Sequence, residues 1–166
     1  LVTSFKQVAV DQSTEIDRAI DIEQFTRDLL ISVKPRRLDI EKFPIEISFD
    51  PGLCVVTKAG PLNQILINLI TNSMVHGFDR REQGKVNILF ERRESELEIT
   101  YRDDGKGVPN EIGKKIFDPF VTTKRGSGGS GLGLHLVYNL VTQVLDGQIH
   151  FFSELNHGVE FIVRFP

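Results

Sequence analysis

A glycine-rich loop that runs straight into an apolar helix is the feature that most constrains the fold of this chain. Residues 126–136 read GSGGSGLGLHL, with five glycines in the first eight positions. Glycine lets backbone N–H groups turn toward a ligand, and the start of a helix favours an anion such as phosphate. A flexible linker is the alternative. It does not explain why an amphipathic helix, predicted over 132–145, begins where the loop ends.

The neighbours of this loop argue against the common nucleotide motifs. Residues 126–131 satisfy G-x-G-x-x-G, but the dinucleotide fingerprint must follow a strand inside a parallel βαβ unit. Here the polar run Thr122–Arg125 precedes the loop, and a hairpin predicted from 148 to 165 follows it. The sequence contains no G-x-x-x-x-G-K-[ST] phosphate loop either.

The rest of the pattern predicts an α+β fold with a largely antiparallel sheet. A capping box at Asp21–Gln24 opens a helix that stops before Pro35. Further helices are expected at about 60–77, 110–116 and 132–145. Alternating apolar residues predict strands at 45–49, 53–56, 86–90, 97–101, 148–153 and 159–165. The closing hairpin makes the sheet largely antiparallel.

Composition limits the classes of function. With 40% hydrophobic and 26% charged residues, the 166-residue chain is typical of one soluble domain with a real core. It has a net charge of −3 and no basic block, so no nucleic-acid partner is expected. No apolar run approaches the roughly 20 residues of a membrane span. The start at Leu1 suggests a fragment, and Cys54, within LCVV, is expected to be a buried, inert thiol.

The helix predicted over 60–77 carries an unusual polar row. Asn68 and Asn72 are four residues apart, so they lie on one side of the helix, and His76 continues the row. Asparagine is a poor helix former, and an amide at the edge of a core needs partners. The pair indicates either a binding site or two structural amides, and this helix alone does not decide between them.

The segment after the fourth predicted strand offers a carboxylate. Asp103 can accept a hydrogen bond from an exocyclic amine, which adenine has at its six-position and guanine lacks. Gly105 and Gly107 would keep side chains away from such a base. A plain turn is the alternative, and this segment taken alone favours it, since Asp and Gly are the usual turn residues.

Taken together, four stretches resemble one family. In chain order, NLITNSMVHGF, DDGKGVP, FDPFVTTK and GGSGLGL resemble the asparagine, first glycine, phenylalanine and second glycine boxes of sensor histidine kinases. The resemblance assigns residues 21–166 to the catalytic ATP-binding domain. It assigns residues 1–20 to a linker and the end of the dimerisation and phosphoacceptor helix. The implied fold is a two-layer α/β sandwich, with a mixed, largely antiparallel sheet packed on three helices.

The resemblance also implies roles for particular residues. Asn68 and Asn72 become the catalytic pair, with Asn72 as the magnesium ligand, and Asp103 becomes the adenine-reading carboxylate. Phe117 and Phe120 are expected to anchor a mobile lid, from about Pro119 to Ser130, which nucleotide orders. The other nucleotide-binding positions are His76, Gly105, Gly107, Val108, Thr122, Thr123, Lys124, Gly129, Gly131, Leu132 and Gly133.

Three positions depart from the family pattern or separate its branches. Related gyrase-like and chaperone-like ATPases have a glutamate that activates water where this chain has Asn68, which implies transfer to a histidine and not to water. Val75 stands where many members have Lys or Arg, so Lys124 or Arg125 is expected to supply that charge. Val159 stands where Thr is common. An ATPase and a nucleotide-sensing binding module remain the alternatives.

The implied biochemistry is phosphoryl transfer from ATP, with Mg²⁺, to a histidine on an upstream hairpin of the same protein. The expected partners are that hairpin and the receiver domain of a response regulator, in a full-length homodimer. The domain is expected in the cytoplasm, with a membrane anchor elsewhere in the protein left open. His135, His150 and His157 share no metal-ligand spacing and are interpreted as ordinary helix, strand and turn residues.

Overall fold

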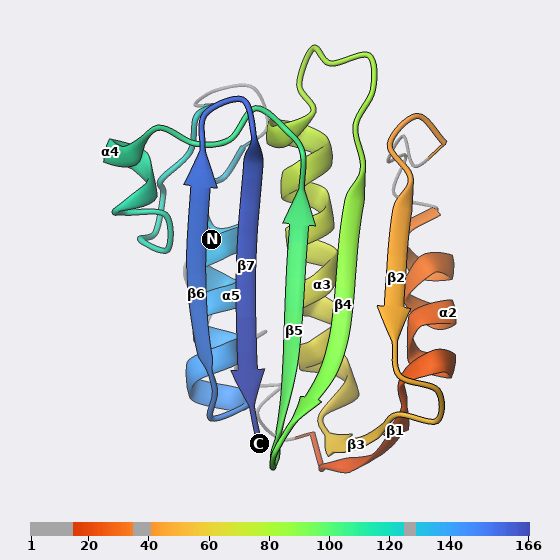
Figure 1. Cartoon of the computed structure of the whole chain (residues 1–166). Helices are drawn as coiled ribbons and strands as arrows, with labels where there is room; N and C mark the ends of the chain where they lie inside the picture. Colours follow the sequence, from red (N-terminus) through yellow and green to blue (C-terminus); the bar gives the residue numbers. More distant parts are fainter. Residues whose placement is uncertain (1–14, 35–40, 125–128) are drawn as a thin grey trace.

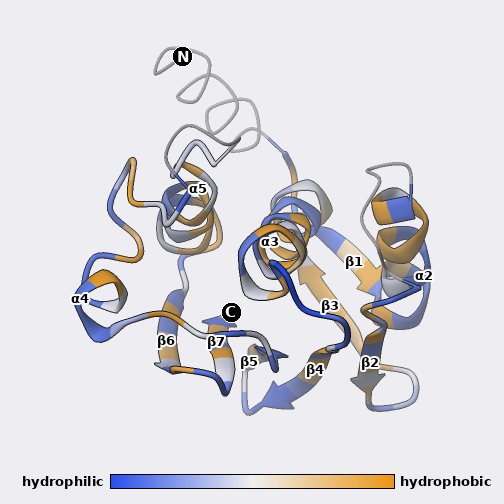
Figure 2. Ribbon diagram, turned by 90° about the horizontal axis from the view of Figure 1, so that it is seen from above, coloured by the Kyte–Doolittle hydropathy of each residue, from blue (hydrophilic) through white to orange (hydrophobic). Residues whose placement is uncertain are grey.

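The computed structural model describes residues 15–34, 41–124 and 129–166. A five-stranded sheet forms one layer, and helices α2, α3 and α5 form the other (Figures 1 and 2). The strand order is β2-β4-β5-β7-β6, with β2 parallel to β4 and every other pair antiparallel. The predicted two-layer sandwich with a mixed, largely antiparallel sheet on three helices is therefore confirmed.

The sheet follows the period-2 pattern of the sequence. Its strands are β2 (Ile45–Phe49), β4 (Val86–Arg93), β5 (Glu96–Asp103), β6 (Gln148–Glu154) and β7 (Gly158–Phe165). On β4, Val86, Ile88 and Phe90 are buried, because alternate side chains of a strand point to the same face. They pack with the apolar stripe of α3, which is also buried and consists of Leu62, Ile65, Leu66, Leu69 and Ile70.

Helix α2 (Ile22–Val33) begins as predicted, but its capping box is only half formed. Asp21 accepts a hydrogen bond from the backbone N–H of Gln24 at 3.0 Å. The Gln24 side chain donates to Asp28 at 3.0 Å instead of returning to the backbone of Asp21. An i,i+4 partner on the same helix face competes with the cap for this exposed amide.

Two predicted helices change their winding before they end. Helix α3 (Ala59–Asn72) continues as the π-helical turn η2 (Ser73–Gly77), and α5 (Gly133–Asn139) continues as η3 (Leu140–Val144). The predicted spans are right, but the wider turns carry i→i+5 bonds, such as Phe78 N–H to Ser73 O at 2.8 Å. π-helical turns of this kind occur frequently at functional sites.

The first strands show two departures from prediction. β1 (Arg18–Asp21), which was not predicted, pairs antiparallel with β3 (Cys54–Thr57). The prediction that Cys54 is buried is wrong, because Val55 and Thr57 take the inward positions and leave Cys54 exposed. The predicted domain boundary after residue 20 falls within β1 and stays a prediction. The helix end predicted over residues 1–12 lies outside the described residues.

The helix predicted over 110–116 is shorter than expected. Only α4 (Asn110–Gly113) is helical, and turns continue to residue 120. None of the α4 residues is buried, so little packing energy supports a longer helix. In residues 15–34, 41–124 and 129–166, the helices lack the length and apolarity that crossing a membrane requires.

Candidate functional site

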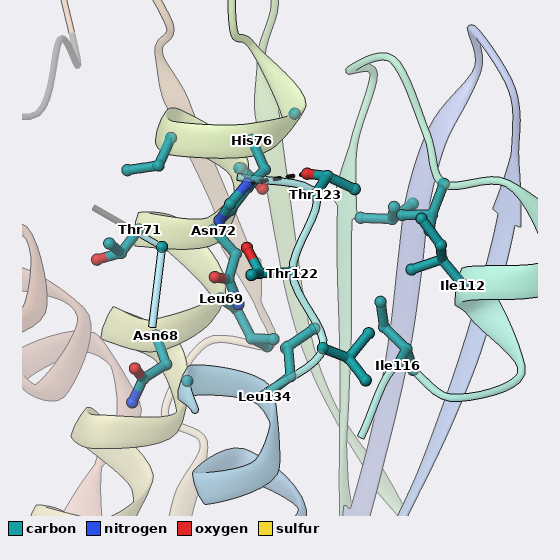
Figure 3. Close-up of a pocket in the computed structure, with 18 of the residues that line it drawn as sticks. Asn68, Leu69, Thr71, Asn72, His76, Ile112, Ile116, Thr122, Thr123 and Leu134 are labelled. Atoms are coloured by element: carbon teal, nitrogen blue, oxygen red, sulfur yellow. Dashed lines mark hydrogen bonds between the residues drawn. The ribbon is translucent and has the colours of Figure 1, made fainter. Parts of the chain in front are cut away.

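A pocket of about 230 Å³ lies between α3 with η2, the loop after β5, and the segment leading to α5. Figure 3 shows Asn68, Asn72 and His76 along one helical face, with Thr122, Thr123 and Ile116 on the segments beside them. The predicted site residues that line the pocket are Asn68, Asn72, His76, Asp103, Gly107, Val108, Thr122, Thr123, Gly129, Gly131 and Gly133. Gly105, Lys124 and Leu132 do not line it.

Asp103 is fixed by three donors at the end of β5. Its Oδ1 accepts from the backbone N–H groups of Gly105 at 3.0 Å and Val159 at 3.2 Å. Its Oδ2 accepts from the hydroxyl of Ser73. Burial raises the pKa of Asp103 above its usual value, and the hydrogen bonds from Ser73, Gly105 and Val159 oppose that rise. Val159, which lacks the hydroxyl of threonine, thus still contributes its backbone.

The glycines after Asp103 are needed by the fold, because the backbone packs closely around them. A Cβ on Gly105 would lie 2.7 Å from the carbonyl oxygen of Gly77, where η2 approaches the loop closely. The next residue, Lys106, donates its N–H to that same carbonyl at 2.9 Å. Gly107 has a φ of +68°, and a Cβ there would lie 2.2 Å from the backbone oxygen of Glu154. Glycine at both positions is therefore required by close backbone packing.

Asn68 and Asn72 converge on the start of α5. A Cβ on Gly133 would lie 3.3 Å from Asn68 Oδ1 and 3.7 Å from Asn72 Oδ1. The Nδ2 of Asn68 donates to the carbonyl of Gln64 at 2.9 Å, and its Oδ1 accepts no hydrogen bond from the described residues. The Nδ2 of Asn72 is buried without a hydrogen-bond partner among the described residues. A buried, unpaired amide group is costly and points to an absent partner.

Polar side chains connect the predicted lid to η2 and the residues after it. His76 Nδ1 lies 3.2 Å from Thr123 Oγ1 (Figure 3). Lys124 Nζ lies 3.0 Å from Asp79 Oδ1, and Lys106 Nζ lies 3.6 Å from Asp79 Oδ2. Burial lowers the pKa of His76, and the charges of Lys124 and Lys106 lower it further. Lys124 is thus paired with a carboxylate outside the pocket, while Arg125 and residues 126–128 lie outside the described residues.

The two phenylalanines expected to anchor the lid behave differently. Phe117 packs against Tyr138, Phe151 and Phe161, with ring centroids 5.4–6.4 Å apart. His135 also holds this segment, because its Nδ1 lies 3.0 Å from the carbonyl of Phe117. The Phe120 side chain is 53% exposed, so the prediction that it anchors the lid is wrong. Its backbone is held instead, by an N–H bond to Gly131 O at 2.9 Å.

Several residues of the site were missed by the sequence analysis. Ile112, Ile116 and Lys106 line the pocket, and Ser73 and Tyr101 support Asp103. A signal existed for Tyr101, since a residue two positions before Asp103 on a strand shares its face. No such signal links Ser73 to Asp103, because the two residues are 30 positions apart.

Comparison with known proteins gives the family. A model described as "Histidine kinase-, DNA gyrase B-, and HSP90-like ATPase" matches residues 57–166, which include both asparagines, Asp103 and the described part of the glycine loop. The chain belongs to this family. The resemblance drawn from the four sequence boxes is thereby confirmed, and the domain is of the ATP-binding type.

Individual relatives are sensor kinases. The chain is 34% identical to sporulation kinase A of Bacillus subtilis (strain 168) over 105 residues, which is 63% of this chain and 16% of that protein. It is 34% identical to the autoinducer 2 sensor kinase/phosphatase LuxQ of Vibrio harveyi over 128 residues, or 74% of this chain and 15% of that protein. The chain therefore spans about a sixth of the length of these relatives.

Solved structures agree with this assignment. The catalytic domain of histidine kinase ThkA, in a nucleotide-free form, has a TM-score of 0.73 and 27% identity, covering 90% of this chain and 95% of that one. Full-length ShkA in complex with AMPPNP also has a TM-score of 0.73, with 29% identity over 93% of this chain and 32% of that one. This chain thus has the fold of a histidine kinase catalytic domain.

Proposed function

We propose that this chain is the catalytic ATP-binding domain of a two-component sensor kinase. It transfers the γ-phosphate of ATP to a histidine in a helical hairpin of the same protein. The observation that carries this proposal is the layout of the pocket. We call the part of the pocket with Asp103 beside Gly77 its first end, and the part where Asn68 and Asn72 lie beside Gly133, at the start of α5, its second end. Adenine offers a donor to the first end, and the second suits the phosphates.

The second end also fits a magnesium ion. Oxygen ligands are the ones that Mg²⁺ prefers, and the free Oδ1 of Asn68 and the unpaired amide of Asn72 meet near Gly133. Turning the Asn72 amide over exchanges its oxygen and nitrogen without changing its shape. The described residues contain no cluster of three or more His, Cys, Asp or Glu side chains that could hold a metal. Asn72, with the phosphate oxygens, would hold the ion, which would neutralise phosphate charge when bound.

The pocket favours transfer to a protein acceptor over hydrolysis. Asp103 is the only carboxylate among the described residues that line it. Because Asp103 already accepts three hydrogen bonds, we assign it to binding the purine base and not to activating water. Asn68, at the position of the water-activating glutamate in related ATPases, has an amide that cannot take a proton from water. The chain's own residues thus bind and orient ATP, while the nucleophile comes from another segment.

The remaining assignments rest on this proposal and on the sensor kinases to which the chain is similar. The histidine-bearing hairpin is the first partner, and the full-length protein is a homodimer. The receiver domain of a response regulator then takes the phosphoryl group. The domain works in the cytoplasm, whether or not the full-length protein carries a membrane anchor.

Labelling with γ-³²P-ATP tests the proposal. The 166-residue chain is expected to bind ATP and to remain unlabelled, because none of its four histidines lies in an acceptor-like context. Adding the histidine-bearing hairpin of the full-length protein as a separate chain should give weak, acid-labile labelling, since the effective concentration provided by tethering is lost. An Asn72→Ala chain with the hairpin is the matched control and should give none.

Three outcomes would contradict the proposal. Rapid phosphate release without the hairpin would favour an ATPase. Strong labelling of the chain alone would place the acceptor within these 166 residues. Tight ATP binding without any transfer to the hairpin would favour a nucleotide-sensing module.

A further inference from the structure

Three buried groups behind the pocket form one hydrogen-bonded chain. Tyr101 OH lies 2.7 Å from Ser73 Oγ, and Ser73 Oγ bonds Asp103 Oδ2. The exposed fractions are 0% for Tyr101, 2% for Ser73 and 6% for Asp103. Solvent therefore does not compete for these bonds, and each proton in the chain has a defined place.

The direction of hydrogen-bond donation among these three groups follows from counting protons. An ionised carboxylate only accepts, so Ser73 donates its single proton to Asp103. Ser73 Oγ is then free to accept from Tyr101, which has one proton and two acceptors in reach, Ser73 Oγ at 2.7 Å and Leu69 O at 3.1 Å. Burial raises the pKa of Tyr101 well above its usual value, which keeps it a donor. The order of donation is Tyr101 to Ser73 to Asp103.

The same count leaves one acceptor position on Asp103 for a ligand. Oδ1 accepts from two backbone N–H groups, those of Gly105 and Val159. Among the described residues, Oδ2 accepts from Ser73 alone, which leaves it one further position. The neighbour of Oδ2 is Gly77, where a Cβ would lie 3.1 Å away, and both residues line the pocket. The absence of a side chain at Gly77 keeps this approach open.

We infer that Ser73, supported by Tyr101, is a positioning residue that makes Asp103 selective for a six-amino purine over a six-oxo purine. This inference rests on the proposed ATP-binding function and deepens it. A carboxylate with its last free position on Oδ2 accepts from an amine and repels a carbonyl oxygen. A carboxylic acid at the same place would donate to the carbonyl. The donation from Ser73 stabilises the ionised form and therefore the selectivity for the amine.

Asp103→Asn provides a sharp test, because the hydrogen-bonded chain can reverse. The Asn oxygen takes the place of Oδ1 and keeps both backbone N–H groups satisfied. The Asn Nδ2 then donates to Ser73, Ser73 to Tyr101, and Tyr101 to Leu69 O. The second proton of Nδ2 faces the ligand. This variant is expected to fold and to invert the preference from six-amino to six-oxo.

The measurement is the dissociation constant for three nucleotides by titration calorimetry. They are ATP, inosine triphosphate with a six-oxo group, and purine riboside triphosphate with neither group. The wild-type chain should bind ATP tightest. Ser73→Ala should reduce the advantage of ATP over inosine triphosphate by about tenfold, and Tyr101→Phe by less. Asp103→Asn should bind inosine triphosphate tighter than ATP.

Ser32→Ala is the matched control, because it removes a serine hydroxyl bond on α2, to Leu29 O at 2.7 Å, outside the pocket. Ser32→Ala should leave the ratio of the dissociation constants for inosine triphosphate and ATP unchanged. If Ser73 had only a structural role, Ser73→Ala would weaken the binding of all three nucleotides equally and leave the ratio of their dissociation constants unchanged. That result would overturn the inference. An ATP preference retained in Asp103→Asn would also overturn it. Failure of the wild-type chain to bind ATP at all would overturn the proposed function itself.

Discussion

The base end of the pocket, around Asp103, and the lid end, which consists of Thr123 at the pocket wall and the neighbouring Lys124, are held by different kinds of contact. Asp103 is buried and bonded by two backbone groups and a buried hydroxyl. The lid end is held by a His76–Thr123 hydrogen bond and a Lys124–Asp79 ion pair, both partly open to solvent.

From this difference we infer that the base end recognises the nucleotide, whereas the lid end closes over it. A buried polar group is costly to misplace, so we expect Asp103 to keep one orientation with and without a ligand. The Lys124–Asp79 ion pair is partly open to solvent, so water and salt weaken it and make it easier to exchange than a buried bond. We therefore expect Lys124 to exchange Asp79 for a phosphate at small cost when nucleotide binds. We expect the base end to be preformed, and the lid end to reorganise when nucleotide binds.

The largest effect should come from breaking the base end. Asp103→Asn is expected to weaken ATP binding by about 1.5–3 kcal/mol, because it replaces a charged acceptor with a donor. Calorimetric titration with a non-hydrolysable ATP analogue gives the affinity, and hydrogen exchange gives the protection of the lid. The lid amides of the free protein should be unaffected. Unchanged affinity would place the base elsewhere.

A smaller effect is expected at the part of the pocket around Asn72. Asn72→Ala should weaken nucleotide binding about tenfold with Mg²⁺ present, corresponding to about 1.4 kcal/mol, and much less with EDTA. The comparison is between titrations in the two buffers. Asn63→Ala, on the same helix and outside the pocket, is the control. Equal losses in both buffers would make Asn72 a structural amide.

pH should affect the stability and the affinity of the base end in opposite directions. Since burial raises the pKa of Asp103 above 3.8, the folded carboxyl keeps its proton at pH values where the unfolded one has lost it. The free energy of unfolding should therefore fall as pH rises from 3.8 through the folded pKa. ATP affinity should rise over the same range, because the acceptor appears.

Urea unfolding and ATP titration across this pH range check the prediction, with Asp103→Asn as the non-titrating reference at this position. A difference in unfolding free energy between the two chains that does not change with pH would contradict it.

The smallest effect is expected at the lid. Asp79→Asn removes the carboxylate that holds Lys124 and Lys106. Amides of residues 121–124 should exchange at most a few-fold faster without nucleotide, and ATP affinity should rise slightly as Lys124 is released. Hydrogen exchange with mass spectrometry measures the first effect. Asp118→Asn, at an acid with no ion pair among the described residues, should change neither. Full protection of the lid in both chains would contradict a lid that reorganises.

The sequence by itself determined most of the layers of this fold. Alternation in 86–90 and 97–101 and the apolar stripe of α3 correctly predicted which faces meet, because one face of each element has to be buried. The four boxes likewise indicated the family. Where burial was read from a short apolar run, as for Cys54, the prediction was wrong, since a run does not say which alternate side chains point inward.

Only the tertiary structure decided how the site is supported. The sequence placed Asn68, Asn72 and Asp103 in one site through resemblance, but it could not pair Asp103 with Ser73 from another element. Nor could it show that Lys124 bonds Asp79 or that Phe120 is exposed. Such contacts join residues far apart in the chain, and their geometry depends on how α3, β5 and the lid segment pack. Local sequence determines periodicity, whereas the partner of each polar group is determined when the layers come together.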